Sequence, residues 1–246
     1  MRLTSRRLKP QSLLFQGIAT SILFLSLTAQ ASDTPPVTPF KAIYTSEWDA
    51  GIALKGEVER SLTRAADGQW LFRTYASAMI ASIEEKSTLT FKQSQVVPQN
   101  YYYKRLVLGK KKEAKLAFNW PAMSVKNNID DKPWEMEILT ATQDKLSYQL
   151  QMRLDLKAEK KGPLSYKIAD GDRIKAYDFN IIGNEKIQSA MGEYDTIKVE
   201  MDRGPDASRQ TYIWYAPELD YMIVKLKQIE ADGKVYALQL KSMETF

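Results

Sequence analysis

Apolar and polar residues alternate along most of the chain beyond position 40. In one such stretch, Leu54, Val58 and Leu62 fall on one side of a two-residue period, and Lys55 and Glu57 fall on the other. Successive side chains of a β-strand point to opposite faces of a sheet, so this period predicts half-buried strands. The pattern returns in the last third of the chain, where it predicts strands over residues 176–182, 195–202, 209–215, 222–231 and 235–243.

Short turn signals separate the alternating stretches. They include Asp67-Gly68, Pro98-Gln99-Asn100, Gly109-Lys110 and Asp232-Gly233. Strands that follow one another through tight turns pair in antiparallel fashion. We therefore predict a mainly β fold, built as a curved antiparallel sheet or as an open or half barrel.

One mid-chain stretch carries two conflicting signals. Every second residue from Leu146 to Leu156 is apolar, which taken alone predicts another strand. However, residues 143–158 contain no Val, Ile or Thr and consist mostly of strong helix formers. On a helix, Leu146, Leu150 and Leu154 would form one apolar stripe. We predict a helix over about residues 142–158.

Two starting points for this helix are open. Thr140 and Gln143 have the three-residue separation of a capping box, and Asp144 could instead cap a slightly later start. Either residue type accepts hydrogen bonds from the first free backbone N–H groups of a helix.

The first 31 residues have the features of a secretory signal peptide. Four cationic residues precede an apolar run over residues 13–27, which ends at Ala29-Gln30-Ala31 before Ser32. Ala29 and Ala31 form the small-x-small pattern expected before a cleavage site. The alternatives are an uncleaved anchor and, because of the Arg6-Arg7 pair, a twin-arginine signal. We favour a cleaved signal over an anchor because polar residues interrupt the apolar run. We favour the Sec route because Lys9 stands where a twin-arginine signal usually has an apolar residue.

This reading predicts a periplasmic protein with no transmembrane span after cleavage. Residues 32–39 contain three prolines and are expected to form an extended tether. Residues 40–246 are expected to form a single β-rich domain, which is long enough to bury one core.

The composition removes several classes of function. The chain contains neither Cys nor His, so disulfides, Cys/His zinc sites, thiol nucleophiles and Ser-His-Asp triads are excluded. The formal charge is +5, but four of the 35 cationic residues belong to the signal peptide, which leaves a nearly neutral domain. A nucleic-acid partner is therefore not expected. No cofactor and no metal are expected, and we predict that the protein is not an enzyme.

Several segments, by their order and spacing along the chain, make it resemble the exported bacterial family DUF3108, a domain of unknown function. The resemblance implies a periplasmic, β-rich protein with one helix in mid-chain, and it implies no activity. The segments that carry it span nearly all of residues 40–246: Pro98 with residues 101–105, Phe118-Asn119-Trp120, residues 143–154, residues 192–200, residues 213–221 and Asp232-Gly233.

Six residues are candidates for a ligand site or polar cluster. Asp144, Ser147 and Arg153 are polar residues in the predicted helix segment, where they would form a buried cluster or an anion site; the alternative is an N-cap with ordinary hydrogen bonds. The aromatic candidates would line an apolar cavity for a lipid chain, or else fill the core. They are Tyr101, Tyr103 and Trp214, with Trp120, Trp134 and Tyr215 as further aromatic residues that could line the same cavity.

Other charged groups are interpreted as structural. The acidic pairs at residues 84–85, 130–131 and 170/172 are expected in strands and turns, because adjacent strand residues point apart and turns favour Asp. Lys110–Lys112 reads as a solvated turn, with anionic lipid headgroups as the alternative.

Three functions remain open. The first is a non-enzymatic periplasmic module that binds a lipid or envelope polymer. The second is a scaffolding factor that binds an envelope protein partner. The third, a carboxylate-based enzyme acting on glycans, is disfavoured because no convergent carboxylate pair is visible.

Overall fold

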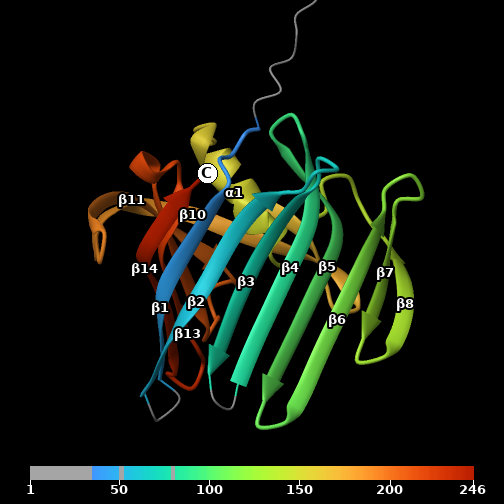
Figure 1. Cartoon of the computed structure of the whole chain (residues 1–246), viewed down its shortest axis with the longest axis horizontal. Coiled ribbons are helices and arrows are strands. Elements are labelled where there is room, and N and C mark those ends of the chain that lie inside the picture. Colours follow the sequence, from blue (N-terminus) through green and yellow to red (C-terminus); the bar gives the residue numbers. More distant parts are fainter. Residues whose placement is uncertain (1–34, 50–52, 79–80) are drawn as a thin grey trace, which may run out of the picture. The chain divides into compact units, whose positions relative to one another are not determined.

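The computed structural model describes residues 35–49, 53–78 and 81–246 (Figure 1). The predicted signal peptide, including Ala29 and Ala31, lies outside the described residues, and so does Ser32 at the predicted cleavage site. Within the predicted tether, Val37 is 2% exposed and belongs to the hydrophobic core.

The first half of the domain is an antiparallel meander in which each strand pairs with the next. Its strands are β1 (Phe40–Asp49), β2 (Ala53–Arg64), β3 (Trp70–Ala78), β4 (Ala81–Lys92), β5 (Gln95–Val107), β6 (Lys110–Asn119), β7 (Ser124–Ile129) and β8 (Lys132–Glu137).

The second half is another antiparallel meander, with a short 3-10 helix η1 (Pro217–Leu219) between two of its strands. The last strand pairs with the first, β14 with β1, and this pairing joins the two halves into one sheet. The strands are β9 (Leu164–Asp170), β10 (Arg173–Ser189), β11 (Gly192–Asp202), β12 (Gln210–Ala216), β13 (Met222–Ile229) and β14 (Val235–Thr245).

Over the described residues the sheet has 14 strands, with β8 at one edge and β9 at the other. These edges do not pair, so the sheet is open, and it curves around the helix (Figure 1). The predicted fold class is confirmed. The five strands predicted in the last third correspond to β10–β14, although β10 extends to Ser189, beyond the predicted end at residue 182.

The predicted helix is present as α1 (Ser147–Lys157), which begins later than residue 142. The reason is Asp144, whose Oδ1 accepts hydrogen bonds from the backbone N–H groups of Leu146 at 2.8 Å and Ser147 at 2.7 Å. The second proposed starting point is therefore the one used. Upstream of it, the Gln143 N–H donates to the carbonyl of Lys167 on β9, so this residue extends an edge of the sheet.

The conflicting periodicity of this segment has a simple cause. Residues two apart on a helix point in different directions, so alternating apolar residues surround α1 instead of marking one stripe. Tyr148, Leu150, Met152, Leu154 and Leu156 are all buried. The helix is enclosed by the curved sheet and needs apolar side chains on most of its circumference.

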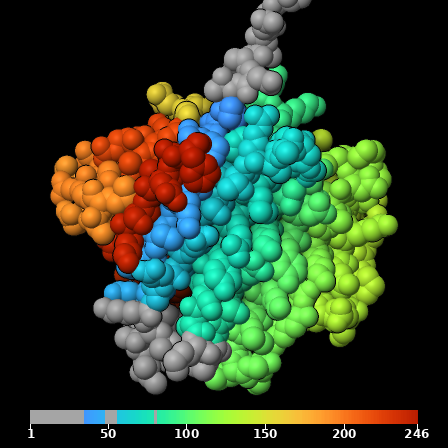
Figure 2. Space-filling model, in the orientation of Figure 1, coloured from blue at the N-terminus to red at the C-terminus, as the bar shows by residue number. Residues whose placement is uncertain are grey.

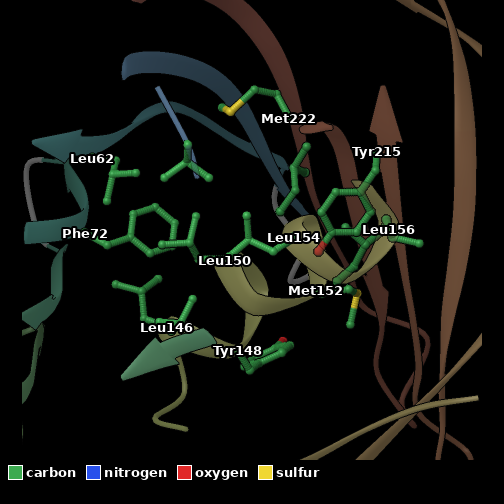
Figure 3. Packing of buried hydrophobic residues seen from close by; sticks show 14 of the residues in the cluster. Leu62, Phe72, Leu146, Tyr148, Leu150, Met152, Leu154, Leu156, Tyr215 and Met222 are labelled. Carbon is green, nitrogen blue, oxygen red and sulfur yellow. The ribbon is translucent and has the colours of Figure 1, made fainter. Parts of the chain in front are cut away.

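The core lies between α1 and the inner face of the sheet (Figure 3). Leu150 and Leu154 point toward Leu62 and Phe72 of the first meander. Tyr148 stacks on Phe179 of β10, with ring centroids 5.6 Å apart. Both halves of the sheet thus pack on the same helix.

The ends of β10 and β11 cover part of the outer face of the second meander. A bulge between Ile181 and Gly183 reverses the direction of the side chains that follow on β10. Beyond it, Ile187 is 4% exposed, and the side chain of Gln239 on β14 donates to the carbonyl of Gln188. In the part of the chain that is described, no helix has the length and apolar character needed to cross a membrane.

Candidate binding site between the helix and the sheet

Polar side chains interrupt the apolar inner face of the sheet at one level. Arg60 on β2 lies opposite Thr74 on β3, which in turn lies opposite Glu85 on β4. The next inward positions, Leu62 and Phe72, are fully apolar. This row forms a polar band under α1. The two ends of the band differ in how their charged groups are paired.

One end of the band centres on Asp144, which is completely buried. Besides its two backbone partners at the start of α1, its Oδ2 accepts a 2.5 Å hydrogen bond from the Ser87 hydroxyl. Ser147 Oγ accepts from the Asp144 N–H at 2.9 Å, which completes a reciprocal cap. Burial raises the pKa of Asp144 to about 6, although these hydrogen bonds act in the opposite direction. Asp144 and Ser147 therefore hold the beginning of the helix.

Glu85 and Tyr101 lie beside this cap. The Tyr101 hydroxyl donates a 2.6 Å hydrogen bond to Glu85 Oε1. Removal from water, together with the negative charge of Asp144, raises the pKa of Glu85 to about 7. Tyr103, two residues after Tyr101 on the same face, is only partly buried, and burial raises the pKa of its hydroxyl.

The opposite end of the band contains two buried arginines. Arg153 of α1 is paired: its Nη2 lies 2.8 Å from Asp220 Oδ2, and its Nε donates to the Asp220 carbonyl at 2.6 Å. Lys157 binds the other carboxylate oxygen of Asp220 at 2.6 Å. Burial lowers the pKa of Arg153, and the Asp220 charge counteracts that shift. Arg153 thus has the carboxylate partner that a buried arginine requires.

Arg60 has no such partner. Its Nη2 donates to Gln149 Oε1 at 2.7 Å, and its guanidinium lies 5.0 Å from the ring centroid of Phe72. Among the described residues, no carboxylate oxygen lies within 4.0 Å of it, and its buried Nε has no hydrogen-bond partner. A buried cation without a counter-ion is energetically unfavourable, by several kcal/mol for an isolated charge.

A small cavity lies at this end of the band, between α1 and the sheet. Its volume is about 20 Å³, and Arg60, Arg153 and Tyr215 contribute to its lining. The Tyr215 hydroxyl is buried and, within the described part of the chain, also lacks a hydrogen-bond partner. One wall is the turn at Asp220 and Tyr221, two consecutive residues with φ of 52° and 59°. Such left-handed conformations are tolerated by aspartate and asparagine but are uncommon for a bulky residue, so the strain lies at Tyr221.

Trp214 is not part of this site. Its neighbour Tyr215 faces the cavity, and Trp214 points to the opposite face of the sheet. There its Nε1 donates to Glu185 Oε2 at 3.0 Å, and the amines of Lys198 and Lys225 lie 5.1 and 4.9 Å from its ring centroid. Of the six candidate residues, the structure brings Asp144, Ser147 and Tyr101 together, places Arg153 and Tyr103 farther along the inner face, and separates Trp214.

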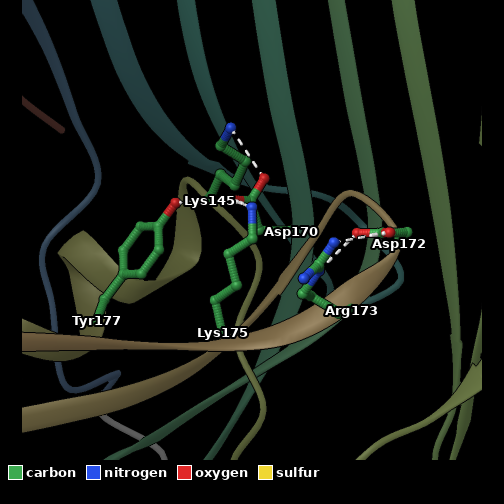
Figure 4. A network of polar contacts seen from close by, with 6 residues as sticks. All are labelled: Lys145, Asp170, Asp172, Arg173, Lys175 and Tyr177. Carbon is green, nitrogen blue, oxygen red and sulfur yellow. Dashed lines mark hydrogen bonds and ion pairs between the residues drawn. The ribbon is translucent and has the colours of Figure 1, made fainter.

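The acidic residues Asp170 and Asp172 are each engaged by separate cationic partners. Asp170 binds the amines of Lys145 and Lys175 and the hydroxyl of Tyr177, whereas Asp172 pairs with Arg173 (Figure 4). The two carboxylates therefore do not converge on one point. In the ranges that the structure describes, no group of three or more acidic residues is arranged to hold a metal ion.

Sequence reasoning missed Arg60 and Glu85 as site residues, although a signal for both was present. Arg60 occupies an inward position between Val58 and Leu62, where the alternation calls for an apolar residue. Glu85 occupies an equivalent position on β4. Tyr215 belongs to the aromatic residues expected to line a cavity or fill the core, and it does line the cavity.

Comparison with models of known protein families identifies the family of this chain. The family model DUF3108, a protein of unknown function, matches residues 56–240. The chain belongs to the DUF3108 family. The matched region of this DUF3108 protein includes both buried arginines and the Asp144 cap. Among curated proteins, none matches it significantly.

Solved structures provide a likeness in fold. A β-barrel-like protein of the domain of unknown function DUF1849 from Brucella abortus aligns with 85% of this chain and 98% of its own, at 10% identity and a TM-score of 0.55. A domain from Vibrio parahaemolyticus, described as an outer membrane lipoprotein-sorting protein domain, aligns with 85% of this chain and 85% of its own. The identity is 9% and the TM-score is only 0.23. The first supports a shared fold, and the second is too distant in shape to do so.

Proposed function

We propose that this DUF3108 protein is a non-enzymatic binding protein of the cell envelope, which holds an amphipathic ligand by an anionic group at Arg60. The signal-peptide features of the first 31 residues support export to the periplasm. The anionic group is a carboxylate or a phosphate, since a guanidinium binds either through parallel N–H donors.

The proposal rests on two polar groups that line the cavity and lack hydrogen-bond partners. Arg60 is 5% exposed, carries a positive charge and leaves its Nε free, and the free Tyr215 hydroxyl lines the same cavity. An anion with two oxygens would accept hydrogen bonds from both groups and neutralise the guanidinium. The aromatic walls, Phe40 and Phe72 among them, suit the apolar part of an amphipathic molecule.

Binding requires a movement of the walls. A volume of about 20 Å³ admits about one water molecule, whereas a headgroup needs several times that space. Tyr221, which lines the cavity and has a left-handed φ of 59°, is the wall that we expect to move, because leaving that conformation relieves strain. Asp220 stays bound to Arg153, so the ligand enters beside the Tyr221 side chain.

The carboxyl groups of the band support a structural role and not catalysis. Asp144 is closed to solvent and both its oxygens are engaged, so no substrate reaches it. Glu85 has a raised pKa, but it does not line the cavity. The disfavoured glycan-acting enzyme requires two carboxylates that both reach a substrate.

The test is a titration of the protein, residues 32–246, with dodecyl phosphate and with dodecanoate below their micellar concentrations, followed by calorimetry. The variant is Arg60→Met, which keeps the length of the side chain and removes its charge. We expect affinity to fall at least tenfold, since one charge-assisted hydrogen bond contributes about 1.5–3 kcal/mol. Dodecyltrimethylammonium, with the same chain and the opposite charge, should not bind at this site.

The matched control is Arg73→Met. Arg73 lies on the adjacent strand, points outward and pairs with Glu84 at 2.9 Å, so its removal should leave affinity unchanged. Equal binding by wild type and Arg60→Met would overturn the proposal. Organic extraction of protein purified from the periplasm, followed by lipid mass spectrometry, provides an independent check: an anionic amphiphile should be enriched in the wild type relative to Arg60→Met.

A further inference from the structure

The hairpin formed by β5 and β6 ends in an exposed apolar tip. Leu106 is 39% exposed and Leu108 is 70% exposed, the highest value among the large hydrophobic side chains of the described residues. The tip stands at the lower edge of the sheet in Figures 1 and 2. Exposed leucines are unfavourable in water, and their presence at a projecting tip is typical of a contact surface.

Cationic side chains surround these leucines. Residues 104–113 include five lysines and arginines and one acidic residue, Glu113. Glu113 is already engaged by Lys111 and by Lys115, the latter at 2.7 Å. Within the described ranges, the remaining cations of the tip form no ion pair with a carboxylate within 4.0 Å; they are Lys104, Arg105, Lys110 and Lys112.

The backbone presents this tip away from the rest of the sheet. β7 ends where Ile129 lies opposite Ala114, and Asp130 in the next turn binds the backbone of Glu113, so only the outer side of residues 110–112 has no strand paired with it. The turn holds Leu108 at a φ of 50°, a conformation that disfavours leucine, next to Gly109 at 77°. A polar residue such as asparagine would be favoured at position 108 on backbone grounds and on solvation grounds alike.

The other hairpin turns differ in chemistry. The β7–β8 turn consists of Asp130 and Asp131, and the β13–β14 turn contains Asp232 and Gly233. Ile181 and Ile182 lie within β10, and Met191, 39% exposed in the β10–β11 turn, has no lysine or arginine within residues 187–194. Among the described turns, the combination of exposed leucines and unpaired cations is therefore specific to the β5–β6 tip.

We propose that the β5–β6 tip docks the protein on an anionic lipid bilayer. Leu106 and Leu108 enter the interfacial region, and the unpaired cations contact the headgroup phosphates. Charge complementarity selects this occupant, because a cluster of lysines and arginines beside aliphatic side chains matches a surface that is anionic outside and apolar beneath. This inference is independent of the ligand site at Arg60, which lies on the inner face of the sheet.

The experiment is co-sedimentation of the protein, residues 32–246, with vesicles of phosphatidylcholine containing 30% phosphatidylglycerol, and with pure phosphatidylcholine as the neutral surface. Each lysine near an anionic surface contributes about fivefold in affinity, so Lys110→Gln/Lys112→Gln should bind at least tenfold more weakly. The matched control is Lys161→Gln/Lys167→Gln, which removes the same charge from exposed positions outside the tip and should bind as the wild type does.

The apolar contribution is tested at Leu108. Leu108→Asn, which suits the positive φ, should also weaken binding while the protein remains folded. Since the chain has no cysteine, Leu108→Cys can be labelled selectively with an environment-sensitive nitrobenzoxadiazole dye. Its emission should rise and shift to the blue on anionic vesicles, whereas the same dye on Asp232→Cys should not respond.

Equal binding to neutral and anionic vesicles would overturn this proposal. Wild-type affinity in the Lys110/Lys112 variant, or an unchanged dye signal at position 108 with bound vesicles, would do the same. Loss of vesicle binding by Arg60→Met with an unchanged tip would assign membrane contact to the ligand site instead. Raising the salt concentration from 0.05 to 0.5 M should release the wild-type protein, since it shortens the Debye length about threefold.

Discussion

Arg60 and Arg153 are equally buried, at 5% exposure each, and line the same cavity, but only one of them has a counter-ion. Arg153 binds the side chain and the carbonyl of Asp220, which fixes α1 to the turn before β13. Arg60 binds one amide oxygen of Gln149 and lies against an aromatic ring. The first arrangement is a completed structural contact, and the second leaves donor capacity and charge for another molecule.

The comparison shows that burial of a charged residue does not by itself indicate function. Hydrogen-bond satisfaction separates the two cases, because a fully paired group has nothing left to offer a ligand. By the same criterion Asp144, although completely buried, is a structural cap. Three substitutions test the distinction between the arginines. They remove the counter-ion of Arg153, neutralise the carboxyl group on the band that contains Arg60, and replace Arg60 itself.

The largest effect is expected for Asp220→Asn, which makes the situation of Arg153 resemble that of Arg60. Asparagine tolerates the positive φ of this position and keeps one acceptor oxygen, so the change is mainly one of charge. We expect the free energy of unfolding to fall by about 3 kcal/mol, since a buried charge loses its partner. Urea denaturation measures it. Adding Arg153→Met should recover most of the loss; if it does not, the pair is not the reason for it.

A smaller effect of opposite sign is expected for Glu85→Gln. The folded-state pKa of about 7 lies above the ordinary value of 4.5, so the stability that protonated Glu85 contributes is fully present below pH 4.5 and is lost as the pH rises through 7. The rise in the pKa of Glu85 from 4.5 to about 7 corresponds to at most about 3 kcal/mol, so at pH 8 the variant should be more stable than the wild type by up to that amount, and at pH 4 equally stable.

The matched control for this prediction is Glu84→Gln. Glu84 points to the other face, and hydrogen bonds from Lys86 and Arg73 lower its pKa, so its removal should not stabilise the protein. Thermal unfolding from pH 4 to 8 compares the three proteins. Destabilisation by Glu85→Gln at pH 8 would show that Glu85 serves Arg60 as a counter-ion, and would break the contrast between the two arginines.

The smallest effect is expected for the stability of Arg60→Met. Replacing an unpaired buried charge with an apolar side chain of similar length removes an unfavourable term, so unfolding should require about 1 kcal/mol more, or be unchanged. Urea denaturation again measures it, with Arg153→Met for comparison, which should lose stability. A loss of more than about 2 kcal/mol in Arg60→Met would mark Arg60 as structural.

The sequence was sufficient for the fold class because two-residue alternation and turn chemistry are local signals. It also located the helix and offered Asp144 as its cap, since a capping residue acts on its near neighbours. It did not indicate β9, the extension of β10 beyond residue 182, or the pairing of β1 with β14. β9 and the extension of β10 pair with their sequence neighbours through short turns; the extension is almost entirely polar, whereas Leu164, Tyr166 and Ile168 of β9 do alternate. The pairing of β1 with β14 joins residues far apart in the chain, for which alternation carries no information.

The candidate site was predicted only in part for the same reason. Asp144, Ser147 and Arg153 were found from their positions in the helix segment. The pairing of Arg153 with Asp220 joins residues 67 positions apart, and the lack of such a pairing at Arg60 is visible only in three dimensions. Trp214 was grouped with the wrong face, because the direction of a strand residue depends on bulges and register that the sequence does not show.

The pairing of β1 with β14 has a consequence for the order in which this protein folds. The first strand cannot complete its pairing until Val235–Thr245, the last strand, has been synthesised and delivered. The two meanders can form early through local hairpins, but closing a loop of nearly the whole domain comes last and is entropically costly. A chain shortened by its final strand would therefore leave β1 and β13 with unpaired edges, and such edges are the ones through which β-proteins aggregate.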